Sequence, residues 1–170
     1  MFTGDRSGDW LFRSMHHAGL ANQPTSTSAD DGLRLRGAWV TAAVKCAPPD
    51  NQPEPAERDM CAPFFERELA LLDELRVVVC LGGFAYAAAC TRWHVRPRPR
   101  FGHGVEAATP DGGPLLVCSF HPSQQNTFTK RLTEPMLDAV FVRAVELAAV
   151  QPVARTERSQ RRSARPGSSA

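Results

Sequence analysis

The clearest hydrophobic pattern in the chain is an abrupt change at residue 121. Residues 115–120, LLVCSF, are almost continuously apolar, and the polar, turn-forming stretch HPSQQNTFTKRL follows directly. An apolar run of this length bounded by turn-forming residues predicts a buried strand that ends in a loop. Ligand sites in open α/β sheets form at the carboxyl ends of strands, so we expect His121, Ser123 and Asn126 to converge on one cleft.

Two further apolar runs predict strands, at residues 38–44 (AWVTAAV) and 77–81 (VVVCL). The segment after the first run, APPDNQPEP, cannot continue as regular structure because proline lacks a backbone N–H donor. Gly82 and Gly83 follow the second run and lead into a short helix rich in small residues, FAYAAAC.

Helical spacing of apolar residues predicts three longer helices. The first runs to about Leu20 with Ser7 as its cap, and the second covers about residues 55–75. The last runs from a cap at Thr133 to about Val150. Its expected inward-facing residues are Met136, Val140, Phe141 and Val145.

Strands that alternate with helices predict an α/β fold with a parallel central sheet and right-handed crossovers. A chain of 170 residues is long enough for one domain, which we assign to residues 1–150. Residues 151–170 are rich in Arg, Ser and Pro, and we expect a disordered basic tail there.

Charge and composition narrow the classes of function. Five arginines and one glutamate give the tail a charge of +4, so the rest of the chain carries −2 of the overall +2. A nucleic-acid footprint on the body must therefore be a local patch. The chain has no stretch of about 18 consecutive apolar residues and no secretory signal pattern, so we expect a cytoplasmic protein without membrane contact.

Four segments carry a family resemblance. HPS followed by Asn126 resembles the second signature motif of the uracil-DNA glycosylase superfamily. FTGDRSGDWL at residues 2–11, WVTAAVKCAPPDNQP at 39–53 and RLTEPMLDAVFVRA at 131–144 are similar to its type-5 branch, the iron-sulfur enzymes of base-excision repair. The resemblance implies a three-layer α/β/α sandwich around a four-stranded parallel sheet. Three of those strands are visible in this sequence, so the first strand is expected to be missing.

The resemblance also implies roles for individual residues. His121 matches the histidine that donates a hydrogen bond to the departing base, and Asp5 matches the acidic residue that orients the attacking water. Asn51, Ser123, Asn126 and Arg131 fall at positions expected to contact substrate or DNA. Phe128 and Leu132 are candidates for wedging into the gap left by an extruded nucleotide.

Each role has a plainer alternative. His121 also suits a polar loop histidine without a catalytic task, and Ser123 and Asn126 suit ordinary turn hydrogen bonding. Asp5 and its neighbour Asp9 equally suit acidic residues that complement a helix dipole.

Five cysteines without a secretory signal favour reduced thiols or metal ligation over disulfides. Cys46 and Cys61 match two ligands of the family's 4Fe-4S cluster, which normally needs four thiolates. Cys80, Cys90 and Cys118 lie in apolar segments and are interpreted as core residues. With two of four ligands, this chain alone is expected to purify without a stoichiometric cluster.

The family's Gly-Leu-Ala-Pro-like motif and an upstream cysteine pair do not precede Phe2, so Met1 is interpreted as an internal methionine of a longer reading frame. The sequence predicts a monomeric, monofunctional glycosylase acting on DNA that contains uracil or other deaminated bases. The alternative is a noncatalytic or nonfunctional fragment. An α/β hydrolase using Ser123 is disfavoured because no Gly-x-Ser-x-Gly element is present.

Overall fold

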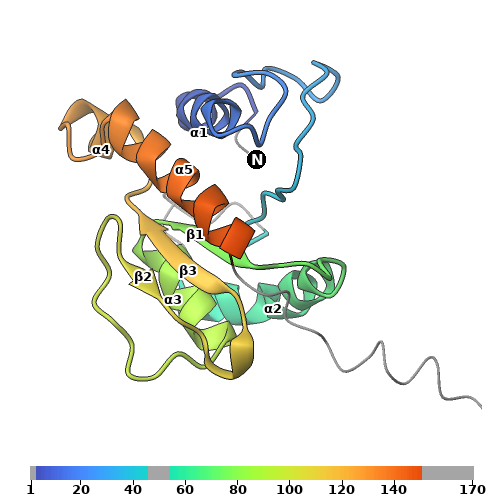
Figure 1. The fold of residues 1–170 in the computed structure, drawn as a ribbon, viewed down its shortest axis with the longest axis vertical. Helices are drawn as coiled ribbons and strands as arrows, with labels where there is room; N and C mark the ends of the chain where they lie inside the picture. Colours follow the sequence, from blue (N-terminus) through green and yellow to red (C-terminus); the bar gives the residue numbers. More distant parts are fainter. Residues whose placement is uncertain (1–2, 46–53, 151–170) are drawn as a thin grey trace, which may run out of the picture.

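The computed structural model describes residues 3–45 and 54–150 (Figure 1). Its elements follow the order α1 (Arg6–His17), α2 (Pro55–Leu69), β1 (Val77–Leu81), α3 (Gly83–Arg92), β2 (Glu106–Ala107), a 3₁₀ turn (Pro110–Gly112), β3 (Leu115–Ser119), α4 (Gln124–Phe128) and α5 (Glu134–Val150). The α/β class is therefore confirmed. The boundary of the domain at residue 150 stays a prediction.

The described sheet has the strand order β1-β3-β2 and is mixed. β1 and β3 run parallel, in a register that pairs Val77 with Leu115 and Leu81 with Ser119. β2 runs antiparallel to β3, so the expectation of a purely parallel sheet is wrong for this strand. The cause is local: the loop before β2 folds back along β3, and the Cys118 N–H donates to the Val105 carbonyl at 2.8 Å.

Residues 38–44 do not form the predicted strand. The segment is irregular, with Ala38 and Val40 packed against the core and Thr41 hydrogen-bonded through its hydroxyl to Glu68. Within the described residues no neighbouring strand pairs with it. An apolar strand sequence needs such a partner for its backbone groups, which explains the failure of the prediction.

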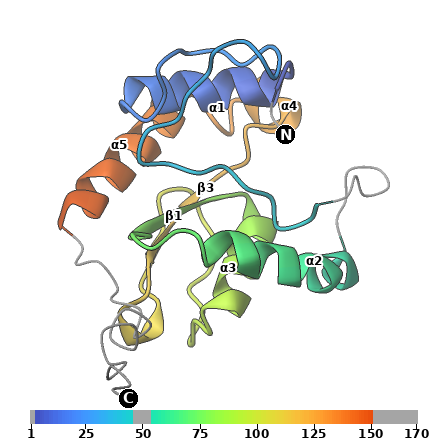
Figure 2. The ribbon, with the colours of Figure 1, turned by 90° about the vertical axis from the view of Figure 1, so that its right-hand side faces the viewer.

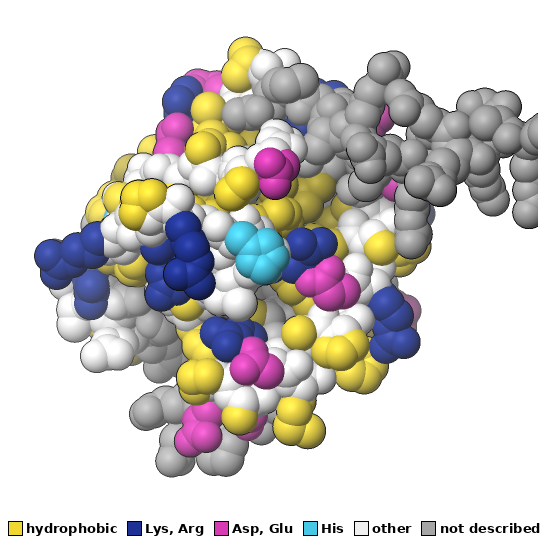
Figure 3. Space-filling model, turned by 90° about the horizontal axis from the view of Figure 1, so that it is seen from below, with side chains coloured by type: hydrophobic (Ala, Val, Ile, Leu, Met, Phe, Trp, Pro, Cys, Tyr) yellow, Lys and Arg dark blue, Asp and Glu magenta, His cyan; other side chains and the backbone are white. Residues whose placement is uncertain are grey.

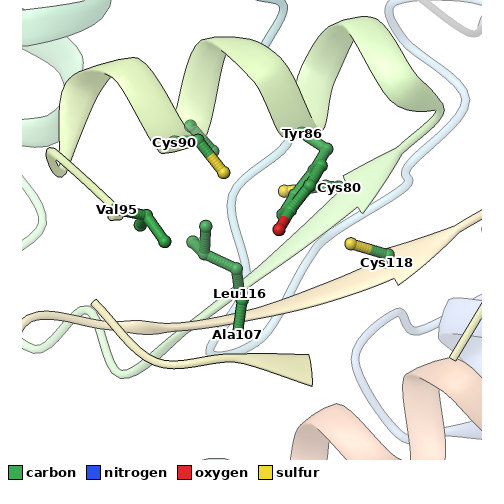
Figure 4. Close-up of a cluster of buried hydrophobic side chains, with 8 residues drawn as sticks. Cys80, Tyr86, Cys90, Val95, Ala107, Leu116 and Cys118 are labelled. Carbon is green, nitrogen blue, oxygen red and sulfur yellow. The ribbon is translucent and has the colours of Figure 1, made fainter. Parts of the chain in front are cut away.

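Helices cover both faces of the sheet, with α1 and α5 on one side and α3 on the other (Figures 1 and 2). Beneath α3, Cys80, Tyr86, Cys90 and Cys118 are buried in one apolar cluster (Figure 4), which confirms the interpretation of these cysteines as core residues. On the opposite face α1 and α5 share a second cluster that includes Leu11.

Two details of the flanking helices differ from the predictions. α1 begins after Asp5, whose carboxylate accepts from the Gly8 N–H at 2.6 Å, so Ser7 is not the cap. In α5 the buried face includes Leu137, Ala144 and Leu147 besides Val140 and Phe141, whereas Val145 is 38% exposed. The expectation of an inward-facing Val145 is therefore wrong.

Helix α2 is shorter than predicted, because it ends at Leu69, and it packs poorly. Pro63 lies inside it, and Cys61 is its single buried residue. Met60 and Phe64 are large apolar side chains that point to solvent, with Met60 78% exposed. In the part of the chain that the structure describes, no helix is long and apolar enough to cross a membrane.

Candidate active site at the carboxyl end of the sheet

The two parallel strands end side by side and place the HPS loop at their carboxyl edge. The Gly82 N–H donates to the Ser119 carbonyl at 2.8 Å, directly after the last β1–β3 pair. His121 lies two residues beyond Ser119 and is partly buried. Its expected location at the carboxyl end of the strands is thus confirmed.

Gly82 forms one wall of the site around His121. Its φ of +95° lies in the left-handed region that favours glycine, and a Cβ built at this position falls 3.3 Å from the His121 Cβ. Both the backbone conformation and the close approach exclude a larger residue here. The Gly-Gly sequence after an apolar strand was a signal for this role that sequence reasoning left unused.

The start of α1 lies against the loop that follows β3, because the Arg6 guanidinium, one residue after Asp5, lies over the Phe128 ring of α4. Burial lowers the pKa of His121 below its ordinary value of 6.5, and the charge of Asp5 acts in the opposite direction and raises it. The imidazole is therefore neutral at pH 7, beside an exposed carboxylate that also caps α1. A neutral imidazole can donate a hydrogen bond to an oxygen that gains negative charge, while a carboxylate can orient a water.

The loop residues after His121 have local structural contacts. Ser123 is the N-cap residue of α4, without a side-chain capping bond. The Asn126 side-chain amide donates to the His121 carbonyl at 2.9 Å and so fixes the turn that carries the imidazole. Ordinary turn chemistry therefore accounts for Asn126, and its contact with DNA stays a prediction.

The rim of the site carries two arginines over aromatic rings. The Arg131 guanidinium carbon lies 4.5 Å from the centroid of the Phe120 ring, and that of Arg6 lies 4.8 Å from the centroid of Phe128. Phe128 is 61% exposed and stays a candidate wedge. Leu132 has no exposed surface, so its proposed wedge role is wrong: it packs in the core with α1 and α5.

Cysteine geometry gives one candidate thiolate. Cys61 is buried in α2, and its Sγ accepts from the Lys45 N–H at 3.3 Å, a contact that suits a thiolate ligand. Burial raises the pKa of Cys80 and also that of Cys118, the latter to about 11, so these residues remain thiols. Across residues 3–45 and 54–150, no three Cys, His, Asp or Glu side chains are grouped to hold a metal ion. The described residues do not fit a four-thiolate cluster.

Two predicted site residues, Cys46 and Asn51, lie outside the described residues.

Comparison with known proteins decides the family. The sequence profile of the Uracil DNA glycosylase superfamily matches residues 1–145. The chain belongs to this superfamily. It is 51% identical over 154 residues to the type-5 uracil-DNA glycosylase of Mycobacterium tuberculosis, which covers 89% of this chain and 57% of that protein. Its identity to the type-5 enzyme of Thermus thermophilus is 47% over 148 residues, covering 86% of this chain and 67% of the relative.

A type-4 uracil-DNA glycosylase of Archaeoglobus fulgidus shares 39% identity over 62 residues, or 36% of this chain and 31% of the relative. The resemblance to the type-5 branch stated from the motifs is therefore confirmed. The chain spans little more than half of the Mycobacterium tuberculosis relative that it matches.

The structure has a cavity away from His121, which is not among its lining residues. This cavity of about 340 Å³ opens between α2 and α3, and both signs of charge line it, including Arg58, Asp59, Glu66 and Arg92. Arg92 forms an ion pair with Glu66, and Arg58 pairs with Asp59 at 2.6 Å. Seen from below, basic and acidic side chains lie intermingled around a histidine, so this face is not a basic footprint (Figure 3).

Proposed function

We propose that this protein excises uracil and other deaminated bases from DNA by hydrolysing the N-glycosidic bond. The observation that carries the proposal is that the start of α1 lies against the loop after β3: the Arg6 guanidinium carbon, one residue after Asp5, is 4.8 Å from the centroid of the Phe128 ring, and the charge of Asp5 acts on His121. Both residues come from one chain, and we propose that the protein acts as a monomer. Membership of the superfamily and the identity to type-5 uracil-DNA glycosylases support this reading.

The chemistry divides between the two residues. Asp5 orients a water whose oxygen attacks the anomeric carbon, and it accepts the proton that this water loses. The bond from the anomeric carbon to the base nitrogen breaks, and its electron pair leaves with the base. The neutral His121 donates to the base oxygen on which negative charge develops. The base leaves as an anion and then takes up a proton, while Asp5 returns the proton of the water to solvent, so the products are a neutral free base and an abasic sugar, without a covalent enzyme intermediate.

The surrounding loop is proposed to hold the DNA. Ser123 and the α4 backbone suit phosphate oxygens, while Arg131 is exposed beside the site. Phe128 is exposed enough to stack against or separate bases. Asn51 is proposed as a further substrate contact. The resemblance places Ala42 where the related type-4 enzymes carry an asparagine that reads uracil, and we propose that without this side chain the site also accepts bases such as hypoxanthine.

Cys46 and Cys61 are proposed as two thiolate ligands of a 4Fe-4S cluster. Support comes from the N–H···S contact at Cys61 and from the position of Cys46 directly after the donor, Lys45. Two thiolates are fewer than the four such a cluster normally takes, so we expect the 170-residue chain to bind well under one cluster per molecule. Iron analysis after anaerobic reconstitution tests this, and about four irons per chain would contradict it.

Single-turnover excision from a uracil-containing duplex tests the function. We expect Asp5→Asn and His121→Asn each to slow excision by about 100-fold or more while DNA affinity is retained. Asp9→Asn is the matched control, because Asp9 is an acidic neighbour on the same helix, and it should excise at the wild-type rate. An Asp5→Asn variant with an unchanged rate removes Asp5 from the mechanism, and wild-type protein without excision refutes the proposal.

A further inference from the structure

His103 lies beside the point where the chain leaves β3. The sequence places it in a glycine-flanked loop, without metal-site spacing or another sign of function. In the structure this loop runs along the end of the sheet, where the Gly104 N–H donates to the Cys118 carbonyl at 2.8 Å. The ring of His103 is partly buried against Ser119 and Phe120.

The ring contacts define which nitrogen accepts. His103 Nδ1 accepts from the Phe120 backbone N–H at 3.4 Å. Ser119 Oγ is 3.5 Å from the same nitrogen, but its proton goes to the Phe120 carbonyl at 2.9 Å. Nδ1 must therefore carry a lone pair, which makes the ring the neutral tautomer protonated at Nε2.

The surroundings keep the ring neutral. Burial lowers the pKa of His103, and a hydrogen bond with the Met136 backbone opposes this shift. Met136 belongs to the first turn of α5, so the ring joins the exit of β3 to the start of that helix. Protonation of Nδ1 would replace this hydrogen bond with a repulsive contact between the Nδ1–H of His103 and the backbone N–H of Phe120.

Phe120 is the residue directly before His121, and it is held from several sides. Its ring centroid lies 5.3 Å from that of His103 and 6.2 Å from that of Phe101, and Arg131 covers it at 4.5 Å. The last bond between the parallel strands is made at Ser119, one residue earlier. The hydrogen bond from the Phe120 N–H to His103 therefore holds the backbone at the first residue beyond the last sheet hydrogen bond.

We propose that His103 is a positioning residue, which fixes the direction in which the chain leaves β3 and so aims His121 at the site shared with Asp5 and Gly82. The catalytic consequence rests on the proposed function, whereas the structural consequence does not. A misdirected imidazole would lower the rate of the bound complex without weakening DNA binding, because small misplacements of reacting groups are costly.

Two substitutions separate the acceptor from the shape of the ring. His103→Phe keeps an aromatic ring beside Phe120 but removes the acceptor, while His103→Asn loses the ring and keeps an oxygen that can reach the Phe120 N–H. In His103→Phe we expect the Phe120 amide to exchange with solvent at least tenfold faster, the His121 ring resonances to shift, and the single-turnover rate at saturating DNA to fall about tenfold. His103→Asn should restore most of the amide protection and of the rate.

The control is His16→Phe, the same change at an exposed histidine of α1, which should leave all three measurements unchanged. Unaltered Phe120 exchange and His121 resonances in His103→Phe overturn the proposal, whatever the activity. Altered resonances together with a wild-type protein that cannot excise uracil refute the proposed function instead. If His103→Phe does not fold, nitrogen-15 NMR of the wild-type protein tests the proposal by identifying the protonated ring nitrogen of His103. A proton on Nδ1 would also overturn the proposal.

Discussion

Helices α1 and α2 are held in the fold in opposite ways. α1 buries Leu11, Phe12 and Met15, and its Ser14 hydroxyl donates to Asp138 of α5 at 2.6 Å. α2 buries Cys61 alone and is joined to its neighbours mainly through charged side chains. Each fully buried large apolar side chain contributes about 1.5–3 kcal/mol, whereas an exposed ion pair contributes about 0–1 kcal/mol.

The difference concerns function, because each helix carries one part of the proposed machinery. Asp5 is the N-cap residue of α1, so the firm attachment of this helix also restricts the position of the carboxylate. α2 carries Cys61, whose surroundings depend on polar contacts at the protein surface. We infer that denaturant or heat disorders α2 and the surroundings of Cys61 before it disorders the Asp5–His121 site.

The largest expected loss of stability comes from a substitution that weakens the packing of α1. Leu11→Ala removes a side chain that is 1% exposed, and we expect a loss of about 2–5 kcal/mol of unfolding free energy because a cavity remains. Phe64→Ala on α2 is the matched control and should cost less than about 1 kcal/mol, since Phe64 is 51% exposed. Urea denaturation measures both, and equal losses would contradict the comparison.

A smaller effect is expected from the polar clamp between α1 and α5. Asp138 accepts from Ser14 and pairs with Arg13 at 3.2 Å, and Asp138→Asn should cost about 1–3 kcal/mol at neutral pH. The pKa of Asp138 is lowered from 3.8: burial raises it, but the bonds to Ser14 and His17 and the charge of Arg13 lower it more. The stabilisation is therefore complete above pH 3.8 and disappears as the pH falls through the lower folded-state pKa.

Thermal unfolding between pH 3 and 7 checks this second prediction. The difference between the wild type and Asp138→Asn should be constant above pH 3.8 and should shrink as the pH falls below it. A constant difference at every pH would show that the carboxylate charge is not what holds the two helices together.

Weaker still is the expected effect at α2. Lys45 Nζ lies 2.6 Å from Glu68 Oε2, and Lys45→Met should cost less than about 1 kcal/mol, because the pair is partly exposed. Salt should reduce this difference further. A loss comparable to that of Leu11→Ala would mean that α2 is held as firmly as α1.

The last prediction leaves stability nearly unchanged and reports on the position of α1. Because the Asp5 charge raises the pKa of His121, Asp5→Asn should lower that pKa further, and asparagine can still cap the helix. Titration of the His121 ring resonances by NMR measures the shift. An unchanged His121 pKa would mean that Asp5 and His121 are not close together in solution. Asp9→Asn is the control and should leave the His121 pKa unchanged.

Strands and helices with a strong local signal could be predicted from the sequence. β1 has the predicted bounds, and β3 and α5 begin and end within one residue of theirs, since continuous apolar runs and a long helical pattern define them. The strand at residues 38–44 failed because pairing depends on a neighbour. The two-residue β2 is too short to leave a pattern in the sequence.

Site residues, too, could be predicted where a local motif marks them and could not where their role depends on distant contacts. His121 and Asp5 were predicted as site residues from motifs; His121 lies at the carboxyl end of the strands as expected, and the roles of both residues stay predictions. Gly82 and His103 were not found, because their importance comes from contacts with residues 39 and 17 positions away. The Gly-Gly pair after an apolar strand is a local sign of the first contact, whereas no local pattern around His103 encodes the second.

The bare backbone at Gly82 has a consequence for how this enzyme family can change. A side chain can rotate away from a new ligand. The Gly82 backbone cannot do so without breaking its hydrogen bond to the Ser119 carbonyl. The imidazole therefore has an immovable neighbour on one flank. If the proposed function holds, room for bulkier bases has to come from the side of the imidazole opposite Gly82.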